Sequence, residues 1–176
     1  EEMEFRCDTI FIDIQGFTDD IGTLIPKEVA WITLDATAEF QAIIEAPCEW
    51  KSLATKSQII NDYLSKTRLG ISWNQPGMSH SRMRTFCTQI PPEINIIYTY
   101  HFQVKRFLTM HPHQRIIFLC GRIPQLNNLR EKKYCTYHQK FTQNFNCATA
   151  NVRRMREHVL STQAEMPVAT PPETHP

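Results

Sequence analysis

The amino-acid sequence predicts a single α/β domain built around a mixed β-sheet. Two patterns predict this class: strand-like segments follow one another directly in the first 46 residues, and helical patterns with one further strand fill the remainder. The length agrees, because 176 residues suit one domain. A chain of this size buries about 70% of the surface that it exposes when unfolded. It therefore needs no disulfide or metal merely to fold.

Three strands are expected before residue 47. The first, residues 7–14, alternates isoleucines with Phe11 and Asp13. The second, residues 27–34, places one alternating set on each face of the sheet, namely Val29, Trp31 and Thr33 against Glu28, Ala30 and Ile32. The third, residues 39–46, follows a turn at 35–38. Strands joined by such short turns pair antiparallel, so these three form a meander.

Helical spacing begins after Pro47. Residues 55–67 form an expected helix whose apolar residues are Ile59, Ile60, Tyr63 and Leu64. Ser79 or Ser81 can cap a second helix, in which Met83, Phe86 and Cys87 are the apolar residues. Residues 93–110 fit either a helix or a strand.

The last third of the chain predicts a strand and two helices. Residues 115–120 are continuously apolar, which is typical of a buried parallel strand. Helices are expected at 123–132 and at 147–160, the latter with Val152, Met155 and Val159 inward. The proline-rich residues 162–176 predict a disordered tail after a domain spanning 5–161. This order indicates a ribonuclease H-like mixed sheet with three antiparallel leading strands and flanking helices.

The composition excludes several classes of protein. With 19 Lys and Arg against 18 Asp and Glu, the net charge of +1 excludes a strongly basic nucleic-acid coat. No Gly-rich phosphate loop and no apolar run of the ~18 residues that span a bilayer occur, so no membrane role is expected. The six cysteines are dispersed, which favours reduced thiols in the cytoplasm or nucleus. Four are expected to be packing thiols: Cys7, Cys48, Cys87 and Cys120.

The other two cysteines belong to a compact metal-ligand pattern. Cys135, His138 and Cys147 form C-x2-H-x8-C, and thiolate and imidazole donors suit tetrahedral zinc. A helix beginning at Cys147 favours its thiolate form. Glu28 is the expected fourth ligand of one structural Zn²⁺. The alternative is an ordinary loop with a buried Cys147, while a thiol–imidazole nucleophile fits this spacing less well.

The same residues resemble the Maelstrom-type domain, a degenerate branch of the DEDDh exonuclease fold found in small-RNA transposon silencing. That family carries a Glu-Cys-His-Cys zinc quartet, matched here by Glu28 within KEVAWITL, by Cys135 and His138, and by Cys147 before Ala148. The opening CDTIFIDIQGF also resembles an uncharacterised insect protein group. The resemblance covers residues 5–160 in outline, through three short blocks.

The acids of a working exonuclease are largely missing. The first strand should contain Asp-x-Glu but holds Asp13 and Gln15, and the last helix should contain His-x-Ala-x-x-Asp but holds Asn146 and Asn151. One acid cannot hold two metal ions, so these four positions are interpreted as vestigial and the domain as a pseudoenzyme. The alternative is an active nuclease, on single-stranded RNA or as a 3'-5' exonuclease, with a rearranged site around Asp13.

The resemblance implies an RNA- or protein-binding module in transposon silencing or antiviral defence. The expected partners are single-stranded RNA and a protein of a silencing complex. Basic residues near the metal pattern are the RNA-binding candidates: Arg122, Arg130, Lys132, Lys133, Arg153, Arg154 and Arg156. A second basic stretch contains Lys105, Arg106, His111, His113 and Arg115. Such charge runs are also common as simple solvated surface.

Overall fold

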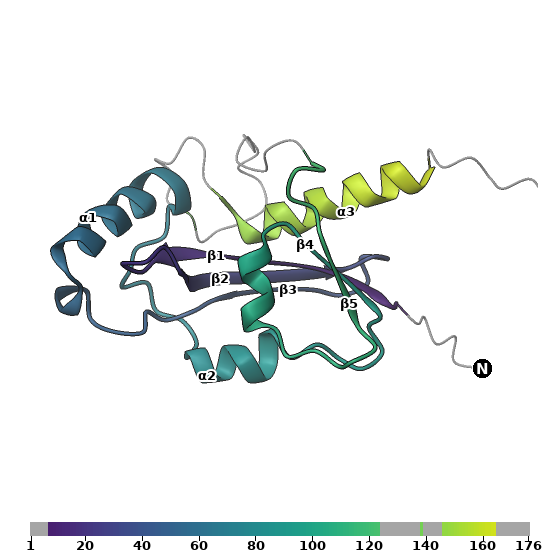
Figure 1. Cartoon of the computed structure of the whole chain (residues 1–176), viewed down its shortest axis with the longest axis horizontal. Helices are drawn as coiled ribbons and strands as arrows, with labels where there is room; N and C mark the ends of the chain where they lie inside the picture. The colour runs from purple at the N-terminus through teal and green to yellow at the C-terminus, as the bar shows by residue number, and fades with distance from the viewer. Residues whose placement is uncertain (1–6, 124–137, 139–145, 165–176) are drawn as a thin grey trace, which may run out of the picture.

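A computed structural model describes residues 7–123, 138 and 146–164 of the chain. Its centre is a five-stranded sheet in the order β3-β2-β1-β4-β5 (Figure 1). The strands are β1 (Thr9–Thr18), β2 (Leu24–Thr33), β3 (Glu39–Ile43), β4 (Ile96–Thr99) and β5 (Arg115–Phe118). β1, β2 and β3 pair antiparallel in succession, whereas β4 joins β1, and β5 joins β4, in parallel. The sheet is therefore mixed, and the predicted α/β class is confirmed.

Helices cover both faces of this sheet. The α-helices are α1 (Thr55–Leu64), α2 (His80–Arg82) and α3 (Ala148–Ala164). Short 3-10 or π segments are η1 (Trp50–Ser52), η2 (Ser65–Leu69), η3 (Met83–Cys87) and η4 (Phe102–Phe107). Figure 1 shows α3 on one side of the strands and α2 on the other. α3 continues three residues past the expected domain end at 161, and the rest of the expected tail lies outside the described residues.

Each face of the sheet has its own apolar core. Ile10, Ile12, Ile14 and Val29 contribute to the core beneath η3 and η4, which insert Met83, Cys87, Val104 and Phe107. The opposite core combines Phe11, Ala30 and Ile32 with three residues of α3: Val152, Met155 and Val159. The predicted face alternation of β1 and β2 and the inward residues of the last helix are therefore confirmed.

The helix expected at 55–67 is present as α1 followed by η2, but two of its apolar residues face solvent. Ile59 is 67% exposed and Tyr63 is 57% exposed, whereas Ser57 and Asn61 are the buried positions. The Asn61 side chain accepts a hydrogen bond from the Thr18 backbone N–H and donates one to the Thr18 carbonyl, both at 3.0 Å. The helix thus turns its polar side to the end of β1, because that strand end offers unpaired backbone groups.

Other predictions in the middle of the chain also need correction. Residues 93–110 contain both a strand and a helix, β4 and η4. β5 is parallel as expected, but it is a half-buried edge strand and ends at Phe118. Phe86 lies in the expected helical segment with Met83 and Cys87, but its side chain is 66% exposed. Cys48 and Cys120 are also exposed, while Cys87 is buried. The helix expected at 123–132 falls almost entirely outside the described residues.

Lys27 is an unusual member of β2, since the whole residue is only 1% exposed. Its ammonium group donates to the Trp73 carbonyl at 2.9 Å and to the Gln75 carbonyl at 2.7 Å. Burial lowers the pKa of this lysine to about 8. The side chain attaches the loop before α2 to β2.

Candidate metal centre

The carboxylate of Glu28 is held at the junction between β2 and α3. Glu28 is fully buried in the sheet. One carboxylate oxygen accepts a hydrogen bond from the Ala148 backbone N–H at the start of α3. The other accepts one from the Gln41 amide at 3.3 Å. A helix N-terminus favours a negative charge, so this position supports the ionised form of a carboxylate that lies away from water.

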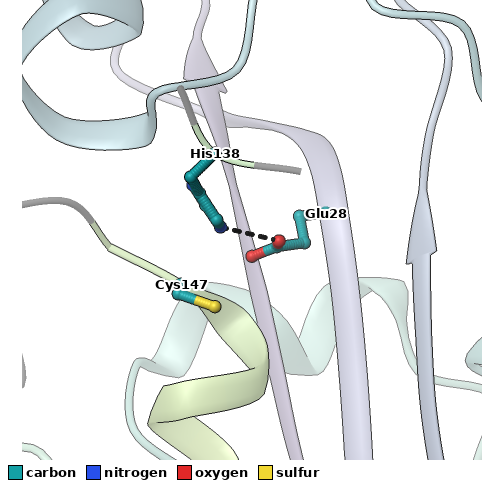
Figure 2. A group of neighbouring side chains, drawn as sticks. All are labelled: Glu28, His138 and Cys147. Carbon is teal, nitrogen blue, oxygen red and sulfur yellow. Dashed lines mark hydrogen bonds and ion pairs between the residues drawn. The ribbon is translucent and has the colours of Figure 1, made fainter. Parts of the chain in front are cut away.

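The imidazole of His138 lies directly against this carboxylate (Figure 2). Its Nε2 is 3.0 Å from Oε2 of Glu28, and both side chains are 1% exposed. On the other edge of the ring, Nδ1 contacts the backbone carbonyl of Leu69, the last residue of η2. The carbonyl can only accept a hydrogen bond, so Nδ1 carries a proton.

This arrangement decides what the second ring nitrogen can do. With the proton on Nδ1, the neutral ring presents the lone pair of Nε2 to a carboxylate oxygen, and two lone pairs at this distance repel. With that tautomer, the contact between His138 and Glu28 is favourable only when a cation lies between them. This cation is either a proton, carried by the carboxyl group or by the ring, or a metal ion bound by both groups. An Nδ1–H bonded to a backbone carbonyl is the usual support of a metal-binding histidine.

Cys147 completes a three-residue cluster. It is 2% exposed, directly precedes α3, and its sulfur points toward the other two side chains (Figure 2). One ligand atom from each of Glu28, His138 and Cys147 lies within 4.8 Å of the others. Ligand atoms around tetrahedral zinc are roughly 3.3–3.8 Å apart, given metal–ligand distances of ~2.0–2.3 Å. The buried cluster can therefore hold a metal ion. Cys135, the remaining predicted ligand, lies outside the described residues.

Residues that the resemblance would equate with exonuclease acids adjoin this centre. Asp13 is 1% exposed on β1, and its Oδ2 accepts hydrogen bonds from the amides of Gln15 and Asn151, each at 2.8 Å. Gln15 is also the cross-strand partner of Glu28. Three of the four predicted positions thus come together. Asn146 is not hydrogen-bonded to this group in the described structure, and it lines a neighbouring pocket instead.

The electrostatics of Asp13 differ from those of a metal-binding acid. Burial raises the pKa of this carboxyl to about 6, against hydrogen bonds from Gln15 and Asn151 that lower it. The charge of Glu28 raises the pKa further. Two amides donate where an active site would supply carboxylates to a cation. The group therefore has the donor pattern of a hydrogen-bonded acid rather than of a two-metal site.

A pocket of about 330 Å³ opens beside Gln15 at the end of β1. Its wall carries uncharged polar and apolar residues: Ile14, Gln15, Phe17, Thr18, Leu24, Leu64, Tyr100, His101, Gln103 and Asn146, together with Gly16 and Gly22. The side-chain oxygen of Asn146 is buried without a hydrogen-bond partner there. The pocket lies where ligands bind in open α/β sheets, beyond the carboxyl ends of parallel strands β1 and β4.

The basic residues predicted to bind RNA are only partly placed at the surface. Arg153 binds the Glu39 carboxylate through Nε at 2.6 Å and through a terminal nitrogen at 2.9 Å. Arg156 donates to the Leu34 carbonyl at 2.7 Å, and Arg154 is half-buried. Arg122 is exposed. The remaining candidates lie outside the described residues: Arg130, Lys132 and Lys133.

Sequence patterns missed two groups of this centre. The Leu69 carbonyl orients His138, and the Gln41 amide contacts Glu28, yet neither residue belongs to any ligand spacing. Alternation along β3 could have placed Gln41 beside Glu28, because the two occupy neighbouring strands. Among the described helices, none combines the length and apolar character needed to cross a membrane. Comparisons with protein-family models, curated proteins and solved structures found no match to the chain.

Proposed function

We propose that the protein is a catalytically degenerate, ribonuclease H-like domain of Maelstrom type, stabilised by one structural zinc ion, that binds RNA or a protein partner in transposon silencing or antiviral defence. One observation carries the proposal. A buried Glu28–His138–Cys147 cluster adjoins an Asp13 carboxylate that is bonded by amides instead of being surrounded by further acids. A site for structural metal and an incomplete site for catalysis thus occur side by side.

The sheet supports the fold assignment. An antiparallel meander is extended by two parallel strands on the β1 side, in the order β3-β2-β1-β4-β5, and a last helix returns across β1 and β2. This strand order and helix position support the proposal of a ribonuclease H-like domain. In that fold the first strand and the last helix carry catalytic acids, which correspond here to Asp13 and Asn151.

The donor set supports zinc as the metal. Thiolate, imidazole and carboxylate donors suit Zn²⁺, and burial of all three side chains suits a closed structural site. Cys135 is the proposed fourth ligand. Elemental analysis of the purified protein should give about one zinc per chain. Cys147→Ser should lose the metal, whereas the matched control Cys120→Ser, at an exposed thiol, should keep it. A folded wild-type protein without metal would contradict the zinc proposal.

The absence of two-metal chemistry is a separate claim with a separate assay. Labelled single-stranded RNA is incubated with Mg²⁺ or Mn²⁺ and with wild type, Asp13→Ala or the nearly isosteric Asp13→Asn. The proposal expects binding without metal-dependent cleavage by any of the three. Cleavage by wild type that both variants abolish would instead establish the alternative, an active nuclease around Asp13.

The proposed location is the cytoplasm or the nucleus. Cys7, Cys48, Cys87 and Cys120 are free thiols, two of them exposed, and a reducing compartment keeps such thiols reduced. The proposed partners, RNA and silencing proteins, occur in these compartments.

A further inference from the structure

The net charge of +1 conceals a separation of charge along the chain. Residues 7–62 contain ten acidic residues and three lysines, with no arginine. Residues 63–123 contain eight basic residues and one acid, Glu93. The first segment supplies β1, β2, β3 and α1, while the second supplies η2 and then everything from α2 to β5. The second part of the molecule is therefore strongly positive although the whole chain is nearly neutral.

The excess positive charge gathers partly on two short helical segments. α2 with η3 and the separate segment η4 insert Met83, Cys87, Val104 and Phe107 into one core, so they cover the same face of the sheet. Their C-terminal ends are also joined, since the Thr109 N–H donates to the Thr88 carbonyl at 2.9 Å and the Ile90 N–H donates to the Thr109 carbonyl at 3.0 Å. Figure 1 shows α2 on the side of the strands opposite α3.

The outer side of these segments is what we call the basic–aromatic face. It consists of six exposed residues: Arg82, Arg84, Phe86, Phe102, Lys105 and Arg106. Phe86 is 66% exposed and Phe102 is 65% exposed, which is unusual for phenylalanine. Arg82 lies over the Phe86 ring at 5.6 Å, and the His101 ring stacks on Phe102 with centroids 4.5 Å apart.

The four cations of this face are not neutralised by the described part of the protein. None of them forms an ion pair there, in contrast to Arg153, which binds Glu39, and to Lys51 and Lys66, which bind Glu49 and Asp62. Unpaired cations beside exposed rings are the combination by which proteins hold single-stranded nucleic acid, with charge for the phosphates and ring faces for the bases. Solvated charge alone does not account for two exposed phenylalanines.

We propose that the basic–aromatic face binds single-stranded nucleic acid. This inference rests on the proposed function of a binding module. The partner is nucleic acid rather than a protein. It binds on the side of the sheet opposite α3, and not at the α3 arginines that the sequence suggested. Lys105, Arg106, Arg82 and Arg84 contact phosphates, while Phe102 and Phe86 stack on bases. Contacts to phosphates and to the faces of bases do not distinguish one base from another. Binding should therefore depend on whether the nucleic acid is single-stranded more than on its base sequence.

A charge-matched pair of variants tests the phosphate contacts. The first changes Arg82, Arg84, Lys105 and Arg106 to Gln, and the control changes the exposed cations Lys51, Lys56, Lys66 and Arg68 to Gln. Both lower the net charge by four. Affinity for labelled single-stranded RNA, single-stranded DNA and duplex RNA is measured from 50 to 200 mM salt, with unchanged circular dichroism and melting temperature as the folding check.

Wild type is expected to bind single-stranded RNA and single-stranded DNA more tightly than duplex RNA. Comparison of the two single strands then shows whether RNA or DNA is bound more tightly. Each phosphate contact contributes roughly 0.7 to the slope of log affinity against log salt. The first variant should lose about 2–3 units of that slope and at least tenfold in affinity at 100 mM salt. The control should stay within about threefold of wild type.

The aromatic contribution is tested separately. Phe102→Ala should weaken single-strand binding by about fivefold or more, because stacking contributes on the order of 1–3 kcal/mol per base. The matched control Tyr63→Ala removes another exposed ring, on α1, and should leave binding unchanged. Polyglutamate of equal charge is added as a competitor. Displacement of the strand by polyglutamate, together with unchanged binding by Phe102→Ala, would show an acidic-peptide surface and overturn the inference.

The outcomes separate this inference from the proposed function. Strand binding by wild type with equal affinity in the two quadruple variants would overturn the basic–aromatic face and leave the binding module intact. A wild-type protein that binds no nucleic acid at 50 mM salt would overturn both this face and the RNA arm of the proposed function. The zinc content of the same preparations would be unaffected in either case.

Discussion

Asp13 is a buried carboxyl group whose polar neighbours are amides rather than cations. Its carboxylate is buried beside two amides that donate hydrogen bonds to one oxygen, while the other oxygen has no partner among the described atoms. The group is consequently poorly stabilised as an anion, and its pKa is raised to about 6. An ionised Asp13 therefore destabilises the folded protein at neutral pH instead of serving a cation.

Replacing Asp13 by Asn should remove that pH-dependent cost. Between pH 4 and pH 6 the unfolded chain loses the Asp13 proton while the folded chain keeps it, so wild-type stability falls as pH rises through this window. A shift from 3.8 to about 6 corresponds to an order of 3 kcal/mol at full burial. The stability of Asp13→Asn relative to wild type should accordingly rise by roughly that amount from pH 4 to pH 7 in urea unfolding.

Asp35 provides a control of opposite sign. Its carboxylate accepts hydrogen bonds from Thr37 and Thr33, which lower its pKa to about 2. The ionised form stabilises the folded chain, and this stabilisation is lost as pH falls through the folded pKa. Asp35→Asn should therefore lose stability relative to wild type as pH rises toward 7. If both variants shift in the same direction, the buried location of Asp13 is not the cause.

At the scale of single elements, α1 is attached to the sheet through hydrogen bonds more than through apolar contacts. Asn61 satisfies both backbone groups of Thr18, and Ser57 donates to the Asp20 carboxylate. An unpaired buried backbone group costs about 1–3 kcal/mol. Asn61→Leu should thus lower the free energy of unfolding by roughly 2–4 kcal/mol in urea titrations, although it increases the apolar character of the helix.

The exposed side of the same helix gives the matched comparison. Ile59 is 67% exposed, so Ile59→Ala should change the free energy of unfolding by less than about 0.5 kcal/mol. The apolar pattern of residues 55–67 predicts the reverse order of effects. A large loss in Ile59→Ala with a small one in Asn61→Leu would restore the orientation inferred from that pattern.

The elements of the fold differ in how well the sequence predicts which residues they bury. Strict alternation in β1 and β2, and the Val152, Met155 and Val159 spacing in α3, place one residue set on a buried face, and the structure agrees. α1 and β5 fail because their environment is set by distant segments. Asn61 hydrogen-bonds to Thr18 at the end of β1, 43 residues away in the chain. β5 lies at the edge of the sheet, a position that its apolar sequence does not indicate.

The metal centre was partly predictable for a related reason. Spacing alone marks His138 and Cys147, and Glu28 was the expected carboxylate ligand. These are the three residues that the structure brings together. Their geometry depends on groups without a side-chain signature, above all the Leu69 carbonyl and the first N–H of α3. Backbone partners of this kind become known only when the chain has folded.

For the whole molecule, the centre joins parts that are far apart in the chain. Glu28 belongs to the sheet, His138 contacts the end of η2, and Cys147 directly precedes the helix α3, which packs on β1 and β2. A metal ion held by these residues connects all three. The binding free energy of such an ion would contribute directly to folding.

Chelation should therefore destabilise the entire domain rather than one loop. Zinc removal at neutral pH is expected to lower the melting temperature by ~10 °C or more, since each kcal/mol shifts the midpoint of a chain this long by about 2–4 °C. Readdition of zinc should restore it. Differential scanning calorimetry of wild type and Cys147→Ser, each with and without chelator, checks this. A variant that melts like metal-loaded wild type would show that the ion is not structural.

The buried Lys27 provides a reporter of motion that requires no added probe. A neutral amine is the form that reacts with acylating reagents, and a pKa of about 8 makes that form far more abundant at neutral pH than in an ordinary lysine. Yet the amine is enclosed by the Trp73 and Gln75 carbonyls and is inaccessible in the closed state. Among the lysines that the structure describes, Lys27 thus has the largest fraction of reactive neutral amine and the smallest exposed area. The rate of Lys27 acylation, followed by mass spectrometry, therefore measures how often the loop before α2 opens.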